Sequence, residues 1–360
     1  MSVTIDITGL RREQILFAPS PLSELAEMLH VMSAPAHHPG LHGWAVATAS
    51  SLPSGLADRI DEASFLWHAT RADILLPAQP QTTLTGELDA LDRLDDELFV
   101  AAALEISCMA QYYRGVPEPL TSERDRRQAL ERATARGPRE AAFAERLLRD
   151  PHSTRNWLRR LLEDCEQKFF AEVWQNTQTG LYSDTRHKAE LLKHKGIGPA
   201  LTSMSSAFEL DEANSRLVAD KLADTAGATK DLGLTCIPTA FGWPHLVVKL
   251  APGWRPVIQY PISGPNLPQP MAVKLVQLRL EALAHPVRMR LCRALARGPH
   301  TVGELAGAYG LTSPEVSRHL SRLKKASLLT TQRRGRYVLH HLDLTAVARL
   351  GNDFLDTLLR

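Results

Sequence analysis

The 360-residue chain lacks most of the features that mark secreted, membrane-spanning or disulfide-stabilised proteins. Its four cysteines, Cys108, Cys165, Cys236 and Cys292, are far apart and form no Cys-x-x-Cys cluster, so we expect small buried apolar side chains rather than a disulfide framework. No apolar run is long enough to span a bilayer, and the N-terminus lacks a signal-peptide pattern. We therefore expect a soluble, cytoplasmic protein with no membrane partner.

Sequence motifs of common enzymes are missing as well. The chain has no nucleophile elbow, no phosphate-binding loop and no dinucleotide fingerprint. Gly196-Ile197-Gly198 is too short a glycine pattern to bind a phosphate without a preceding strand. We therefore predict no catalytic residues and no cofactor.

Charge is distributed unevenly along the chain, although the net charge is only +2. Residues 271–341 hold thirteen Lys and Arg against three acidic residues, a net charge of +10, whereas residues 1–270 carry a net charge of −7. Lys and Arg replace the counterions condensed on phosphates, so a basic module on an acidic body is typical of a nucleic-acid binder. A solvated basic face is the alternative that charge alone leaves open.

The basic module has the start and stop signals of successive helices. A first helix ends at Gly298-Pro299, and a capping box of Thr301 and Glu304 starts the second. Gly310 suits a left-handed helix end, and Thr312 with the proline two residues later starts a third helix. This order predicts a helix-turn-helix.

The third helix separates apolar from polar side chains. Val316, Leu320 and Leu323 share one face, and the hydroxyl and basic side chains fall away from it. Arg can donate two hydrogen bonds to guanine O6 and N7, while Ser and Lys position phosphates. Strand-like residues 328–332 and 337–341 then flank a basic hairpin, or wing. The predicted DNA contacts are Thr312, Ser313, Ser317, Arg318, Ser321, Arg322, Lys325, Arg333, Arg334 and Arg336. The alternative is a surface helix with ordinary basic residues.

Residues 275–358 resemble the ArsR/SmtB family of winged-helix transcriptional regulators. The resemblance is carried by Ala282-Leu283-Ala284-His285-Pro286-Val287-Arg288, Glu304-Leu305-Ala306, Val316-Ser317-Arg318-His319-Leu320 and Arg334-Gly335-Arg336-Tyr337. It implies a homodimer that binds an imperfect palindrome in double-stranded DNA, with a dimer seam made by helices at 273–283 and 344–358. The seam residues would be Val276, Leu280, Leu283, Val347, Leu350, Phe354 and Leu358.

The best-known members of that family sense metal ions, and this sequence departs from their pattern. Thr301 and Gly303 occupy the positions of the family's Cys-x-Cys site. Residues 342–360 contain neither His nor Glu, which the family's second site requires. His340 and His341 are neighbours in a predicted strand and would point to opposite faces. Because transition metals need suitably spaced imidazole or thiolate ligands, we expect no metal site.

The fold class predicted for the whole chain is mainly α with minor β. Residues 1–262 are expected to form a mostly helical α+β domain, and 263–270, rich in Pro, Gly, Ser and Asn, a linker. Residues 271–360 are expected to form the winged-helix domain. The expected N-terminal elements are a strand at 3–7, a helix from Ser20-Pro21 onward, helices throughout 86–195, a further helix within 208–230, and strands at 234–240, 245–250 and 256–260.

The N-terminal domain resembles the corresponding region of long, actinobacterial-type ArsR regulators, whose N-terminal domain is uncharacterised. The stretches that carry this resemblance are Phe17-Ala18-Pro19-Ser20-Pro21-Leu22, Pro35-Ala36-His37-His38-Pro39, Ile237-Pro238, Gly242-Trp243-Pro244 and Tyr260-Pro261. The resemblance brings no known ligand with it.

Two groups of side chains in the N-terminal domain were candidates for binding. Histidines gather at His30, His37, His38, His42 and His68, but without the spacing of metal ligands, so we expect loop or core histidines. A small-molecule effector pocket would be lined by Trp44, Trp67, Trp243 and Trp254, because such pockets are mostly apolar. The alternative is that these aromatics pack a core.

Two functions from different classes remain open. The favoured one is a DNA-binding transcriptional regulator, a repressor, whose N-terminal domain responds to a non-metal effector or binds a protein. The alternative is an enzyme fused to a DNA-binding module that regulates its own gene. A constitutive repressor with a purely structural N-terminal domain is the third and weakest possibility.

Overall fold

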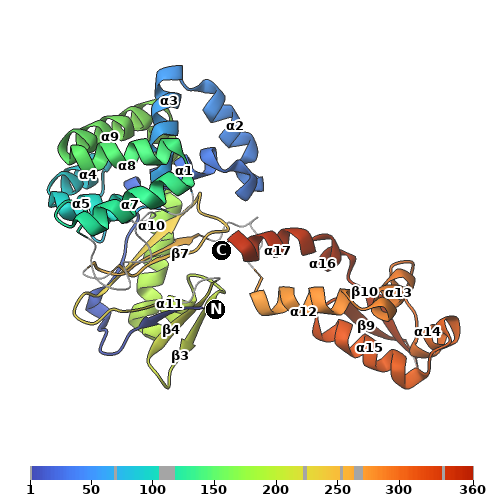
Figure 1. The fold of residues 1–360 in the computed structure, drawn as a ribbon. Helices are drawn as coiled ribbons and strands as arrows, with labels where there is room; N and C mark the ends of the chain where they lie inside the picture. Colours follow the sequence, from blue (N-terminus) through green and yellow to red (C-terminus); the bar gives the residue numbers. More distant parts are fainter. Residues whose placement is uncertain are drawn as a thin grey trace. The chain divides into compact units, whose positions relative to one another are not determined.

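The computed structural model describes residues 2–68, 71–104, 118–221, 225–251, 254–262, 271–334 and 337–359 (Figure 1). The chain divides into two compact units, Met1–Leu267 and Pro268–Leu359. It is mainly helical with a smaller share of strands, which confirms the predicted fold class. The predicted linker, 263–270, lies outside the described residues. None of the helices in the described ranges has the length and apolar character needed to cross a bilayer.

The first unit combines helices with two four-stranded sheets. Its helices are α1 (Pro21–Ser33), α2 (His42–Ser51), α3 (Ser54–Ala63), α4 (Leu84–Asp92), α5 (Asp96–Ala103), α7 (Glu123–Arg136), α8 (Pro138–Arg149), α9 (Pro151–Cys165), α10 (Ala171–Lys195) and α11 (Ile197–Thr202). Short 3-10 turns are η1 (Arg12–Gln14), η2 (Pro35–His37), η3 (Pro39–Leu41), η4 (Ser64–Leu66) and η5 (Asp73–Leu75), and η6 (Glu166–Phe170) is a π-helical turn. Its strands are β1 (Ser2–Asp6), β2 (Ile15–Phe17), β3 (Phe208–Asp211), β4 (Arg216–Asp220), β5 (Thr225–Ala228), β6 (Leu234–Thr239), β7 (Val247–Lys249) and β8 (Val257–Pro261).

The first sheet corrects one prediction. Where a helix was expected within 208–230, the chain forms β3, β4 and β5, in a sheet of order β3-β4-β1-β5. Leu217 and Ala219 of β4 are buried and alternate with more exposed neighbours, as in a half-buried strand. Ile5 of β1 lies opposite Leu217, so the pairing that decides the structure comes from residues about two hundred positions away. A local helical pattern could not reveal it.

The second sheet has the order β2-β6-β8-β7, and α1 packs against its strand β6. β2, β6 and β8 are parallel, and all six residues of β6 are buried, as expected for a parallel strand covered on both faces. The strands predicted at 234–240, 245–250 and 256–260 are confirmed as β6, β7 and β8. Ser20 caps α1 by accepting a hydrogen bond from the Ser23 N–H at 3.0 Å, and residues 21–31 of this helix are all buried.

Because α1 is enclosed, its polar side chains find partners inside the protein. Arg71 Nε donates to Glu27 Oε1 at 2.7 Å, and the side chains of this ion pair are 2% and 0% exposed. Ser23 accepts a hydrogen bond from the Gln259 amide at 2.6 Å, and Glu24 accepts one from the Ala240 N–H at 2.9 Å. Burial raises the pKa of Glu24 to about 7.

In the helical half of the first unit, α8 and α9 each begin at a proline. α7 ends at Arg136, and Gly137-Pro138 starts α8; Asp150 then caps α9 by accepting from the Ser153 N–H at 2.9 Å. α9 continues through η6 into α10. One large apolar cluster unites α1 with α3, α4, α5, α7, α8 and α9, and a second lies between the sheets and α10 and α11.

The second unit has the predicted helix, helix, turn, helix and hairpin order (Figure 1). Its elements are α12 (Val273–Leu283), α13 (Pro286–Leu295), α14 (Val302–Tyr309), α15 (Ser313–Lys325), β9 (Leu329–Arg334), β10 (Tyr337–Leu342), α16 (Leu344–Ala348) and α17 (Leu350–Leu359). The last helix was predicted as a single segment, but it divides at Arg349, where α16 ends. The apolar core of this second unit contains Leu291, Leu305, Val316, Leu320 and Leu323.

The Glu27–Arg71 pair gives a test of the first unit. Arg71→Ala should lower the free energy of unfolding of this unit by about 3–5 kcal/mol, because it leaves a buried carboxylate uncompensated. All six tryptophans precede residue 255, so tryptophan fluorescence during urea unfolding reports this unit alone. Arg139→Ala is the control, because the Arg139–Asp61 pair is 70% and 67% exposed and should matter little. Equal effects of the two substitutions would show that the buried pair does not hold α1 in place.

Candidate nucleic-acid interface

Two capping boxes define the helix-turn-helix. Thr301 caps α14 and Thr312 caps α15, each with the glutamate three residues later bonding back to the capping residue, as predicted. The Thr312 N–H donates to Glu315 Oε2 at 2.9 Å, and this bond holds the pKa of Glu315 below its usual range. Gly310 ends α14 with φ 64° and ψ 34°, the left-handed conformation predicted for it.

The third helix, α15, presents the predicted polar face. Val316, Leu320 and Leu323 are buried, so the opposite side of the helix is turned to solvent. Each of the predicted contacts on this helix and its cap is exposed: Thr312, Ser313, Ser317, Arg318, Ser321, Arg322 and Lys325. Hydroxyl and guanidinium donors on one exposed helical face can reach base edges and phosphates in a major groove.

The wing is a two-stranded antiparallel hairpin. β9 pairs with β10, with Arg334 opposite Tyr337 and Arg333 opposite Val338. Arg333 and Arg334 are exposed at the end of β9. Gly335 and the predicted contact Arg336 lie outside the described residues.

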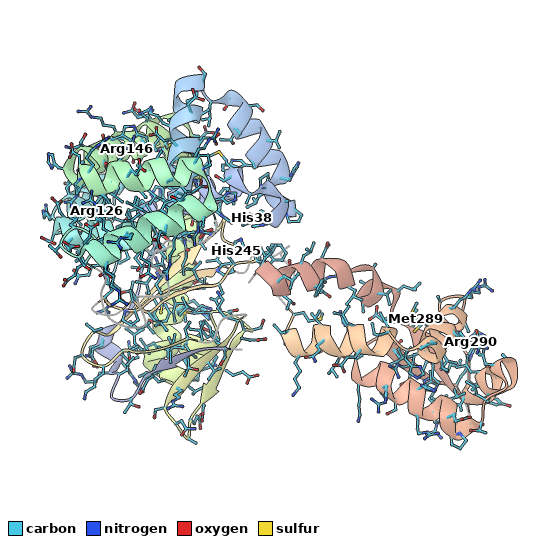
Figure 2. All side chains as sticks on the ribbon, in the orientation of Figure 1. His38, Arg126, Arg146, His245, Met289 and Arg290 are labelled. Atoms are coloured by element: carbon cyan, nitrogen blue, oxygen red, sulfur yellow. The ribbon has the colours of Figure 1, made fainter. Side chains whose placement is uncertain are left out.

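A second basic surface lies on α13 and the residues that follow it, and none of its arginines was among the predicted DNA contacts. Arg290, Arg293 and Arg297 line an open depression together with His300 and Tyr309. Figure 2 marks Arg290 beside Met289 on this helix. Arg290 also lies over the Tyr309 ring, 5.0 Å from its centroid. Guanidinium groups on an open surface are suited to binding phosphates.

The predicted seam residues divide into two groups. Leu280 of α12 and Phe354 and Leu358 of α17 are 40%, 40% and 44% exposed. Val276 is only 1% exposed, so within one chain it already packs inside the unit. Leu283 and Val347 pack partly against the core of the unit, and Leu350 is half-buried.

An ion pair that the sequence did not indicate joins the two seam helices. Arg279 Nη1 of α12 donates to Asp353 Oδ2 of α17 at 2.9 Å, and both side chains are buried. Arg279 Nε also donates to the Ala326 carbonyl at 3.3 Å. The exposed leucines and phenylalanine therefore stand on helices that are fixed relative to each other.

The four tryptophans considered for an effector pocket all lie in the first unit. Trp67 is fully buried, and its Nε1 donates to Ser33 Oγ at 3.2 Å. Trp44 packs edge-on against Phe241, with ring centroids 4.7 Å apart, and Trp254 packs against the same apolar cluster. Trp243 is half-buried.

The thiols and the family's metal positions are placed as follows. Cys165, Cys236 and Cys292 are free and buried, which confirms the prediction for these three, and burial raises the pKa of each thiol. Cys108 lies outside the described residues. Thr301, which the resemblance places with Gly303 at the family's thiolate positions, caps α14, and Gly303 lies in the first turn of that helix.

The fold and the exposed basic face of the second unit define a winged helix-turn-helix domain. The chain belongs to the family of unknown function DUF5937, whose model matches residues 1–266. A model of a helix-turn-helix domain matches residues 283–332. The C-terminal unit is of the ArsR/SmtB type. The chain therefore carries a DNA-binding, transcription-regulating domain that follows the DUF5937 domain in the sequence.

Two relatives named as repressors each match between a fifth and about a quarter of the chain. A biofilm growth-associated repressor of Agrobacterium fabrum is 31% identical over 96 residues, 26% of this chain and 82% of the relative. The HTH-type transcriptional repressor SmtB of Mycobacterium tuberculosis is 40% identical over 82 residues, 21% of this chain and 61% of the repressor.

Solved structures match over the same fraction of the chain. A possible transcriptional regulator for arsenical resistance is 36% identical, with 21% of this chain and 79% of that chain covered and a TM-score of 0.20. The repressor BigR from Xylella fastidiosa is 29% identical, with 22% and 82% covered and a TM-score of 0.20.

The Thr312 cap gives a test of how α15 is held. Thr312→Ala should destabilise the helix by about 1 kcal/mol, because it removes the acceptor for the Glu315 N–H. Where local opening limits exchange, amides of residues 313–325 should then exchange about fivefold faster, measured by mass spectrometry. Thr331→Ala, on the exposed face of β9, is the matched control. Unchanged exchange in Thr312→Ala would mean that packing alone sets the start of α15.

Proposed function

We propose that the protein is a transcriptional repressor that binds a palindromic operator in double-stranded DNA as a homodimer. The observation that carries this proposal is the surface of α15 and β9. Nine of the ten residues predicted to contact DNA are described, and all nine are exposed above a closed apolar core. The relatives named as repressors support the direction of regulation.

The homodimer is proposed from the outer faces of α12 and α17. Leu280, Phe354 and Leu358 are large apolar side chains left in solvent on neighbouring helices, and an isologous seam would bury them. A two-fold dimer would place its two recognition helices about 34 Å apart, one turn of DNA. Operator binding would then exclude polymerase from the promoter.

In this proposal the DUF5937 domain is the effector-binding domain of the repressor and has no catalytic role. A small-molecule effector would bind near Trp44, Trp243 and Trp254, of which Trp44 and Trp254 are partly buried against the same apolar cluster. It could change operator occupancy only by binding the two states of the repressor with different affinity.

Operator recognition is tested with three arginine variants. Arg318→Ala and Arg322→Ala should each weaken binding to the cognate site by about 5- to 150-fold while changing nonspecific binding less, because base contacts carry specificity. Arg334→Ala should weaken binding to all sequences similarly and reduce the salt slope by about one. The cognate site would come from genome-wide binding-site mapping, and affinities from mobility shifts at several salt concentrations.

Lys195→Ala is the control for these measurements, because Lys195 is an exposed cation at the end of α10 in the other unit. Wild-type affinity and specificity in all three arginine variants would remove the basis for the DNA-binding proposal at this face.

The dimer seam is tested by placing a charge in it. Leu280→Asp and Phe354→Asp should shift the protein from a dimer to a monomer of 39.8 kDa, measured by light scattering, because a buried carboxylate without a partner is costly. Val46→Asp is the control, since Val46 is 49% exposed on α2 in the other unit. If both seam variants remain dimeric, the interface lies elsewhere.

A further inference from the structure

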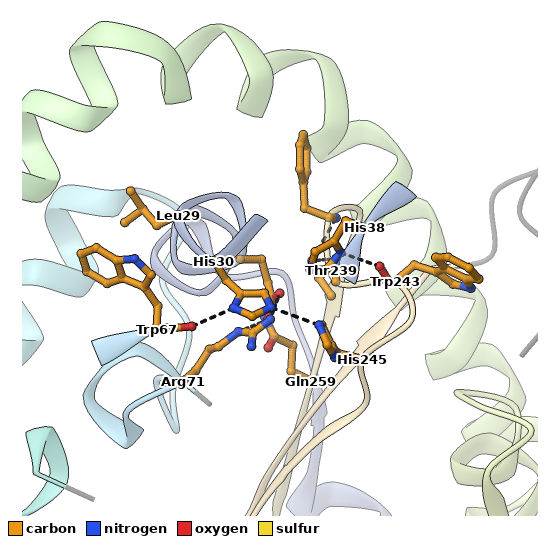
Figure 3. Close-up of polar contacts among 12 residues, drawn as sticks. Leu29, His30, His38, Trp67, Arg71, Thr239, Trp243, His245 and Gln259 are labelled. Atoms are coloured by element: carbon orange, nitrogen blue, oxygen red, sulfur yellow. Dashed lines mark hydrogen bonds and ion pairs between the residues drawn. The ribbon is translucent and has the colours of Figure 1, made fainter. Parts of the chain in front are cut away.

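Three histidines from distant parts of the DUF5937 domain meet at one point (Figure 3). His30 lies in the last turn of α1, His38 between η2 and η3, and His245 just before β7. One ring nitrogen of each lies within 4.8 Å of those of the other two. The sequence pattern pointed to His30 and His38 but not to His245, which is 215 positions from His30.

The hydrogen bonds of two of these rings set their tautomers. Nδ1 of His30 is 2.9 Å from the Trp67 carbonyl, and Nδ1 of His38 is 2.7 Å from the Trp243 carbonyl. A carbonyl accepts only, so each Nδ1 carries the hydrogen and each neutral ring keeps a lone pair on Nε2. A ring held by Nδ1–H against a carbonyl with Nε2 turned to a common point is the usual arrangement of metal-binding histidines.

Two Nε2 atoms already lie at the spacing of ligands to one ion. Nε2 of His30 is 3.0 Å from Nε2 of His245, a hydrogen bond in which His245 Nε2–H donates to the His30 lone pair. A bound ion would take the place of that hydrogen, which would move to Nδ1 of His245. Tetrahedral Zn²⁺ with Zn–N distances of about 2.0–2.1 Å separates its nitrogens by about 3.3 Å. The three ring nitrogens lie within 4.8 Å of one another, so small rotations of the rings would bring them to the separation of ligands around one ion.

Nε2 of the third histidine, His38, is a buried acceptor that lacks a hydrogen-bond partner among the described residues. The His38 side chain is 1% exposed. A buried acceptor left in this state typically costs about 1–3 kcal/mol, which a coordinated cation would offset.

We propose that His30, His38 and His245 bind one borderline transition-metal ion of the Zn²⁺ class, with a water molecule as the fourth ligand. Three neutral imidazoles favour Zn²⁺, Co²⁺ or Ni²⁺ over Ca²⁺ and Mg²⁺, which prefer oxygen. Glu27, a buried carboxylate on the same helix, is committed to Arg71, so the two charges largely offset each other beside the site. This site lies outside the winged helix, and two of its three histidines, His30 and His38, were expected to be loop or core residues.

The ion would connect the end of α1 to the loop between β6 and β7. It binds the folded domain and not the unfolded chain, so its binding free energy adds to the stability of the first unit. Tryptophan fluorescence, which reports this unit alone, provides that readout.

The test uses the full-length chain, free of any polyhistidine tag and stripped with a chelator. Wild type should bind one Zn²⁺ per chain by calorimetry and gain stability that rises with the logarithm of the free Zn²⁺ concentration. With Co²⁺ in place of Zn²⁺, it should give the visible bands of a four-coordinate site. His38→Gln and His245→Gln should each weaken Zn²⁺ binding by at least about 100-fold, since even loss of an outer partner costs about 10- to 100-fold. His187→Gln, an exposed histidine on α10, should bind as wild type does.

Both loss variants are first compared with wild type by circular dichroism in the absence of metal. His245 is only partly buried and lies in a loop, so its substitution keeps the test open if His38→Gln does not fold. Wild-type affinity in a folded His245→Gln variant overturns the proposal. Failure of wild type to bind Zn²⁺ also overturns it and would identify the cluster as a hydrogen-bonded core network.

Discussion

The fold of the DUF5937 domain depends on the burial of α1. Residues 21–31 are all enclosed, so the helix has no solvent-facing side on which to place its polar groups. Burying a polar group without a partner costs several kcal/mol, and each such side chain on α1 therefore binds a specific segment. Glu24 binds the backbone after β6, Glu27 binds Arg71, and His30 binds the Trp67 carbonyl. These bonds fix the sheet, the helical layer and the intervening turns around one helix.

The histidine cluster follows from the same constraint. His30 is on the last turn of the enclosed helix, so its ring can extend only toward neighbouring segments of the protein. The carbonyls of Trp67 and Trp243 then orient two of the rings. Two of the tryptophans considered as walls of an effector pocket, Trp67 and Trp243, thus act on the cluster through their backbone carbonyls. The side chains of Trp44, Trp67 and Trp254 belong to or pack against the large apolar cluster.

In the winged helix, most polar side chains face water and need no partner inside the protein. Once the apolar residues of α13, α14 and α15 close a small core, the basic side chains have only the outer surface left. One buried ion pair, Arg279–Asp353, is the exception, and it sets α12 against α17. Breaking such a pair is far more costly than never having formed it, so it specifies how the two seam helices are arranged.

Sequence reasoning succeeded where structure is decided locally. The caps at Thr301 and Thr312, the left-handed Gly310, the exposed face of α15 and the basic charge of the wing all depend on residues within one or two helical turns. What the sequence determined by itself was therefore a winged helix able to bind DNA. Tertiary structure alone decided that residues 208–230 are strands, because Leu217 pairs with β1, and that His245 joins His30 and His38. Both depend on contacts between residues more than two hundred positions apart, about which local periodicity carries no information.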